Sequence, residues 1–308
     1  MLKIEVVLKD VVLSIGDINI RLICYGDNWR CFFSGDVERF CKEGSPHITL
    51  KAYYGKLPRF SEKDLVFDSG GNWALFRRKS SWMFFLKSPV TGKLPYAVAI
   101  INRNFSRGKI YLRPLKEHIY GEDSLPLVDP LEYPLDEILM VHLLSFNRGV
   151  LLHACGIEYN DGGVIFVGIS GSGKSTIANL YKKIKEVNIL SDDRIIVRRQ
   201  DTSFYIYGTP WHGDSGVCSQ RKTPLKAIFF LKHSPQNFCR RLLSVNAASR
   251  LFVCSFPTFW DKRGLEYTLN VCSHLAENIP CYELGFVPDD SILEFLNNRL
   301  CSFLKQNL

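Results

Sequence analysis

The sequence lacks the features that would place it in a membrane or a secretory route. No run of about eighteen apolar residues occurs, so no transmembrane helix is predicted. Residues 1–10 alternate apolar and charged side chains, whereas a signal peptide carries a continuous apolar core. We therefore expect neither a leader nor membrane insertion.

The cysteines lack the spacing of a metal or redox motif. No two of the ten form Cys-x-x-Cys, which argues against a zinc ribbon or a thioredoxin-type site. Several lie in apolar stretches such as Leu251-Phe252-Val253-Cys254, a setting typical of buried reduced thiols. Reduced thiols favour the cytoplasm.

A concentrated basic patch is also missing. The formal net charge is +8, from 39 Lys and Arg against 31 Asp and Glu. That balance suits acidic partners, but the basic residues are dispersed along the chain, and a phosphate-handling site also needs positive potential. We expect no nucleic-acid partner.

The 308 residues are enough for two domains, and the residue pattern changes along the chain. Residues 1–125 are β-rich and carry no chemical motif, so they are interpreted as an accessory or substrate-recognition domain. Strands are expected at 4–15, 18–25, 47–54, 73–77, 82–86, 97–101 and 109–112.

Residues 126–308 are predicted to form a second, α/β domain with a mixed sheet, which makes the chain α+β overall. A Pro-containing linker at 126–130 precedes a helix at 134–147. A strand at 150–157 and a turn at 160–163 then lead back antiparallel into a second strand. Further strands are expected near 187–190, 195–197, 227–231 and 281–284, and further helices at 247–256 and 290–305.

The segment 168–175, Gly-Ile-Ser-Gly-Ser-Gly-Lys-Ser, matches the phosphate-binding pattern G-x-x-x-x-G-K-[ST]. An apolar strand at 164–167 leads in and a helix-compatible run at 176–183 leads out, which favours a phosphate loop over a plain glycine-rich turn. Lys174 is expected on the outer phosphates and Ser175 on Mg²⁺. The nucleotide contacts are assigned to Gly168, Ser170, Gly171, Ser172, Gly173, Lys174, Ser175 and Thr176. Neither Leu-Ser-Gly-Gly nor Asn-Lys-x-Asp occurs, which favours ATP over GTP.

Three features outside the loop are candidates for the same site. Asp192-Asp193 follows a strand, where one acid can serve Mg²⁺ and the other can act as a general base; a turn pair with Arg194 is the alternative. His153 lies on the strand that precedes the loop, where a buried core histidine is the alternative. The segment 208–214 either brings His212 and Asp214 to the metal or substrate, or is a tight turn anchored by its tryptophan.

With His153, the 160–163 turn, the loop and Asp192-Asp193 in this order, the chain resembles the catalytic domain of HPr kinase/phosphorylase. More specifically, it is similar to the related proteins with Leu-His-Ala, Ser-Asp-Asp and Gly-Thr-Pro-Trp segments. The resemblance implies a phosphoenolpyruvate-carboxykinase-like fold that transfers phosphate from ATP to a serine hydroxyl. It also implies Lys174 on the β- and γ-phosphates, Asp193 as general base, His153 as its neighbour and Asp192 near the metal.

The chain departs from that family in three places. Thr176 stands where true HPr kinases usually carry Glu, no Glu-Ile-Arg-Gly segment follows, and residues 1–125 do not resemble the family's N-terminal domain. These departures argue against HPr as the substrate. Some relatives modify peptides, including lasso-peptide kinases, and HPr kinases are oligomers, so the resemblance implies a peptide acceptor and a homo-oligomer.

The sequence therefore predicts an ATP- and Mg²⁺-dependent kinase acting on a serine hydroxyl of a protein or peptide. Two alternatives stay open: a kinase of a free amino acid or sugar alcohol, and a regulator that binds ATP without transferring phosphate.

Overall fold

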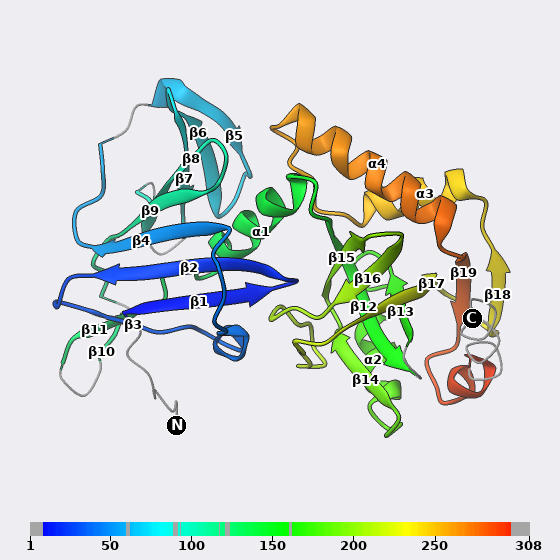
Figure 1. The fold of residues 1–308 in the computed structure, drawn as a ribbon. Helices are drawn as coiled ribbons and strands as arrows, with labels where there is room; N and C mark the ends of the chain where they lie inside the picture. The colour runs from blue at the N-terminus through cyan, green and yellow to red at the C-terminus, as the bar shows by residue number, and fades with distance from the viewer. Residues whose placement is uncertain are drawn as a thin grey trace. The chain divides into compact units, whose positions relative to one another are not determined.

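The structure is a computed structural model that describes residues 9–59, 62–88, 92, 94–116, 118–120, 124–159 and 162–296. The chain forms two compact units, Met1–Met140 and Val141–Leu308 (Figure 1). Within the described ranges, no helix is both long and apolar enough to cross a membrane.

The N-terminal unit is built on one eight-stranded sheet in the order β1-β2-β4-β9-β8-β7-β6-β5. The β2–β4 and β4–β9 pairs are parallel and the other neighbours are antiparallel, so the sheet is mixed. Its strands are β1 (Asp10–Ile15), β2 (Ile18–Tyr25), β4 (Ile48–Tyr54), β5 (Leu65–Asp68), β6 (Trp73–Arg77), β7 (Ser81–Leu86), β8 (Ala97–Asn102) and β9 (Arg107–Leu112).

Alternation along the strands determines which face of this sheet is covered. In β2, Ile18, Ile20 and Leu22 are fully buried, and the residues between them are only partly buried. Successive strand residues point to opposite faces, so a period of two produces one apolar face.

Two short 3₁₀ turns, η1 (Val37–Phe40) and η2 (Glu62–Asp64), lie in the connections between strands of this unit.

The linker predicted at 126–130 is wrong. Residues Pro126–Val128 form β11, which pairs with β10 (Ile119–Tyr120) and with β3 (Arg30–Cys31) in a three-stranded sheet. The next residue, Asp129, accepts hydrogen bonds from Ser34. These contacts hold the segment in the N-terminal unit, and the division falls at 140/141 instead of the predicted 125/126.

The C-terminal unit contains a second mixed sheet in the order β13-β12-β15-β16-β17-β19-β18, with β14 also paired to β12. The strand β17 pairs with β13 as well as with β16, so the sequence of neighbouring strands from β13 to β17 closes on itself. The strands are β12 (Val150–Tyr159), β13 (Gly162–Val167), β14 (Val187–Ser191), β15 (Arg194–Gln200), β16 (Ser203–Tyr207), β17 (Lys222–His233), β18 (Phe238–Arg241) and β19 (Cys281–Phe286).

Helices cover both faces of this sheet. Along β12, Leu152 and Ala154 face a core shared with α3 (Ser244–Val253) and α4 (Lys262–Asn278). Cys155 and Ile157 face a second core shared with α2 (Lys174–Tyr181). Because both faces of the sheet are covered, β12 and β13 are almost wholly buried. Strands of this kind carry continuous apolar runs in the sequence.

The expected α+β class with a mixed sheet is confirmed, and so is the antiparallel strand that precedes the loop, since β12 and β13 pair antiparallel. The first helix, α1, spans Leu135–Ser145, inside the predicted 134–147. Of the helix predicted at 290–305, residues 291–296 are helical and those from 297 lie outside the described ranges. Asn160 and Asp161 of the predicted turn also lie outside them.

Candidate functional site

The phosphate loop lies between β13 and α2, as the sequence predicts. Gly171 and Gly173 have φ angles of +78° and +98°, a region that L side chains rarely adopt. At Gly168, a Cβ atom would stand 2.2 Å from the Ser172 hydroxyl oxygen, so this turn of the loop is tight. The glycines are therefore needed for the backbone path itself.

Lys174 begins α2, and its ammonium group is folded back onto the loop. Its Nζ donates to the carbonyl oxygens of Gly168 at 3.0 Å and Ile169 at 3.1 Å. The residue is buried, and burial lowers the pKa of Lys174. The negative charge of Asp193 acts in the other direction and offsets part of this lowering. An anion at the loop would give this ammonium a partner of opposite charge.

The loop has hydrogen-bonding groups to offer a phosphate. The Ser172 hydroxyl is buried and has no hydrogen-bond partner among the described residues. No described backbone or side-chain group accepts from the amides of Gly171, Gly173 or Ser175. Amides at the start of a helix form an anion site when they are left unpaired. The loop therefore fits a phosphate group.

The long strand β12 brings His153 and Asp193 together. Its first half pairs with β15 and its second half with β14, so the turn at Asp192-Asp193 lies where β12 changes partner. The Ala154 amide donates to the Asp193 carbonyl at 3.1 Å, and the Gly168 amide lies 3.4 Å from the His153 carbonyl. As a result His153 Nε2 stands 2.9 Å from Asp193 Oδ1.

Charges around Asp193 keep its carboxyl group ionised. Burial alone would raise the pKa of Asp193, but the hydrogen bond with His153 and the charges of Arg194, His153 and Lys174 outweigh it. The pKa is therefore lowered. The coupling to Lys174 shows that this carboxylate and the phosphate loop share one electrostatic environment.

Two further residues of this cluster were not predicted as functional. The Arg194 guanidinium pairs with Asp193 Oδ2 and lies 4.3 Å from the centre of the Phe256 ring. Phe256 also packs edge-on against His153, because its amide donates to the carbonyl of Leu151 in β12. The Asp-Asp-Arg order signals Arg194, whereas no local pattern signals Phe256.

Asp192 is fully buried and holds the 208–216 segment in place. Its Oδ1 accepts from the Gly213 amide at 2.8 Å and its Oδ2 from the Ser215 amide at 3.0 Å. The Ser191 hydroxyl donates to the Trp211 carbonyl at 2.7 Å, and the Thr209 hydroxyl to the Arg194 carbonyl at 2.6 Å. The segment is thus attached to the Asp192-Asp193 turn from both sides.

Gly213 marks the point where the two predicted metal ligands meet. A Cβ atom there would lie 2.9 Å from Asp192 Oδ2 and 3.1 Å from the Ser175 hydroxyl oxygen. One carboxylate and one hydroxyl beside a phosphate loop suit Mg²⁺, which takes few protein ligands and completes its shell with phosphates and water. Within the described ranges, no three His, Cys, Asp or Glu side chains gather into a metal cage, either at this point or elsewhere.

The candidates His212 and Asp214 lie at the surface. His212 and Asp214 are exposed on the 208–216 segment, so the buried anchor of that segment is Asp192. His233 Nε2 lies 2.8 Å from the carbonyl oxygen of Gly171 at the tip of the loop, a contact that the sequence did not predict.

No protein-family model matches the chain, and no curated protein matches it. The resemblance to HPr-kinase-type catalytic domains therefore stays a hypothesis that rests on the residues above.

Proposed function

We propose that the C-terminal unit is a phosphotransferase that moves the γ-phosphoryl group of ATP to a hydroxyl group, most readily a serine of a protein or peptide. The observation that carries the proposal is the His153–Asp193 pair, 2.9 Å apart, whose carboxylate shares its electrostatic environment with Lys174 of the loop. A phosphate site and an ionised base in one place are the two requirements of phosphoryl transfer to a hydroxyl.

Each residue has a role that its contacts support. The loop amides and Lys174 bind the phosphates, and the Ser175 hydroxyl and Asp192 would hold Mg²⁺, which neutralises phosphate charge when bound. Asp193 accepts the proton of the acceptor hydroxyl. Arg194 and His153 hold the two carboxylate oxygens in place, since each pairs with one of them.

The lowered pKa of Asp193 makes it a weak base that is ionised at neutral pH. That suits a phosphoryl transfer with a loose transition state, where orienting the acceptor oxygen matters more than removing its proton early. The same cluster supports the proposed kinship with HPr-kinase-type catalytic domains and their phosphoenolpyruvate-carboxykinase-like fold. The expected homo-oligomer stays a prediction.

The test separates nucleotide binding from transfer. The intact chain is titrated with ATP and Mg²⁺ by calorimetry, then incubated with radiolabelled ATP and a library of serine-containing peptides. Lys174→Met should weaken ATP binding. Asp193→Asn should leave ATP binding within a few-fold and lower transfer by about 10²–10⁴-fold.

Asp201→Asn is the matched control, because Asp201 lies exposed in the turn between β15 and β16 and adopts a φ of +52° that Asn tolerates. Transfer that survives Asp193→Asn would refute the base assignment. ATP binding without any product, against peptides, free serine and sugars alike, would refute the kinase and favour the nucleotide-binding regulator.

A further inference from the structure

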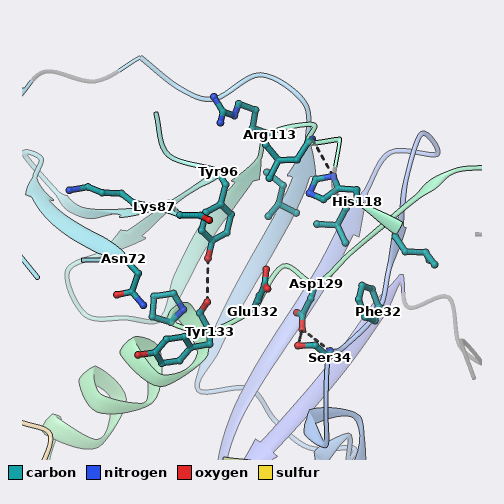
Figure 2. Close-up of a pocket in the computed structure, with 16 residues that line it drawn as sticks. Phe32, Ser34, Asn72, Lys87, Tyr96, Arg113, His118, Asp129, Glu132 and Tyr133 are labelled. Atoms are coloured by element: carbon teal, nitrogen blue, oxygen red, sulfur yellow. Dashed lines mark hydrogen bonds between the residues drawn. The ribbon is translucent and has the colours of Figure 1, made fainter. Parts of the chain in front are cut away.

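The N-terminal unit contains a pocket of about 440 Å³, within the size range of small-ligand sites (Figure 2). One side is formed by Tyr96, just before β8, by Leu112 at the end of β9, and by Arg113 and Leu115 after it. The other side is formed by Phe32, Ser34 and the 127–134 segment. The sequence of this unit carries no chemical motif.

Two carboxylates lie at the pocket. Asp129 is buried and accepts three hydrogen bonds, from the Ser34 amide and hydroxyl and from the Leu131 amide. The Glu132 carboxylate makes no hydrogen bond or ion pair with any described residue. Glu132 lines the pocket but is also exposed to solvent, and its partial burial, followed by the charge of Asp129, raises the pKa of Glu132.

Two basic residues of the lining, Lys87 and Arg113, do not compensate this charge. Lys87 pairs with Asp68, 2.7 Å from Nζ to Oδ2. Figure 2 shows the Lys87 ammonium and the Arg113 guanidinium directed away from Glu132 and Asp129. The Arg113 Nε is buried and has no described acceptor, so it is a competing feature, a donor that would suit an anion.

Aromatic side chains also line the pocket. The Tyr96 hydroxyl donates to the Tyr133 carbonyl at 3.3 Å, and burial, followed by the nearby carboxylates, raises the pKa of Tyr96, so the ring stays neutral. Phe32 and the Tyr133 ring complete the lining. Aromatic faces attract a cation in addition to any carboxylate that it meets.

We propose that this pocket binds a primary ammonium or guanidinium group. A cation entering it gains a charge-assisted hydrogen bond to Glu132, a second carboxylate behind it and aromatic contacts around its alkyl stem. A free alkylamine and the Lys or Arg side chain of a polypeptide carry the same group, and both are admissible sources. The proposal concerns binding in the N-terminal unit and does not depend on the phosphotransferase.

The test is calorimetric titration of the intact chain, without nucleotide, by agmatine, cadaverine and an N-acetylated, amidated Ala-Lys-Ala peptide. The same peptide acetylated on lysine Nζ is the uncharged probe. Cationic probes should bind and the acetylated peptide should not. Glu132→Gln should weaken binding about tenfold or more, since it removes the charge that the cation meets.

Glu132→Gln is a usable variant because the raised pKa of Glu132 means that the folded state gains nothing from its charge at neutral pH. Glu43→Gln, on an exposed residue of the same unit, is the matched control and should bind as the parent does. Preference for the diamines identifies a free amine as the ligand, and preference for the peptide identifies a polypeptide side chain.

Three results would overturn the proposal: no cationic probe binds at millimolar concentration, Glu132→Gln binds them as the parent does, or succinate binds in their place through Arg113. None of these readouts involves ATP or transfer. Failure here would therefore leave the phosphotransferase proposal untouched, and failure of the phosphotransferase would leave this one untouched.

Discussion

Replacing Gly173 with alanine separates two reasons for glycine in the phosphate loop. Gly173 has a φ of +98°, and a Cβ atom there would stand 2.4 Å from Cζ of Phe286, a fully buried ring. Gly171, two residues earlier, has a φ of +78° but no atom within 4 Å of its Cβ position. Gly171→Ala therefore adds backbone strain alone, whereas Gly173→Ala adds strain and a steric clash.

The two variants should differ in stability by the cost of the clash. Left-handed backbone costs an L residue about 1–2 kcal/mol, which is the full penalty expected for Gly171→Ala. Displacing a ring in a filled core costs a further ~1–3 kcal/mol. We expect Gly173→Ala to lower the free energy of unfolding by about 2–5 kcal/mol.

The measurement is urea unfolding, monitored by hydrogen exchange with mass spectrometry. Peptides within 162–181 are analysed, so that only unfolding of the C-terminal unit is measured. Phe286→Leu supplies the internal check, because a smaller side chain removes the clash and should make Gly173→Ala less costly in that background. Equal penalties for the two glycines, or an unchanged Gly173→Ala penalty in the Phe286→Leu background, would refute the role given to the Phe286 ring.

Three further predictions concern the stability of the C-terminal unit. Glu283 is buried between Arg240 and Arg250, and Glu283→Gln should cost about 1–3 kcal/mol at neutral pH. The hydrogen bond from Arg250, with the charges of both arginines, holds the pKa of Glu283 below its ordinary 4.5, so the stability that Glu283 contributes is present above that pH and is lost as the pH falls. The urea midpoints measured at pH 7 and pH 4 should therefore differ less for Glu283→Gln than for the parent. Equal differences in the two proteins would contradict the assignment. Asp261→Ala removes the side-chain cap that accepts from the Arg263 amide at the start of α4 and should cost about 1 kcal/mol in urea unfolding. Leu243→Asp, which adds a cap to α3 at an exposed position that has none, should change stability in the opposite direction, and loss of stability there would count against the capping argument.

Much of the local structure follows from patterns in the sequence, but the order of strands does not. The strand β6 has the predicted bounds, because its alternation and the turns around it are encoded locally. The parallel pair β4–β9 joins segments separated by four other strands, and no local pattern specifies that pairing. Helix α4 was not predicted; its buried face combines Gly264, Thr268 and Cys272 with Leu275 and Ala276.

The linker error has a similar cause. Prolines near residues 126–130 are typical of a connection between domains, and the sequence offered no sign that Pro126–Val128 pairs with Arg30–Cys31 almost a hundred residues earlier. Pro126 is tolerated in β11 because it begins the strand.

The sequence alone determined the phosphate loop at 168–175, because its glycine angles, its lysine and its helix start depend on neighbouring residues. Only the tertiary structure decided what lies beside it. His153, Asp193 and Phe256 come from separate parts of the chain and meet because β12 exchanges β15 for β14 at one point, with the segment after α3 alongside. Such a meeting depends on strand pairing over long separations, which local patterns do not encode.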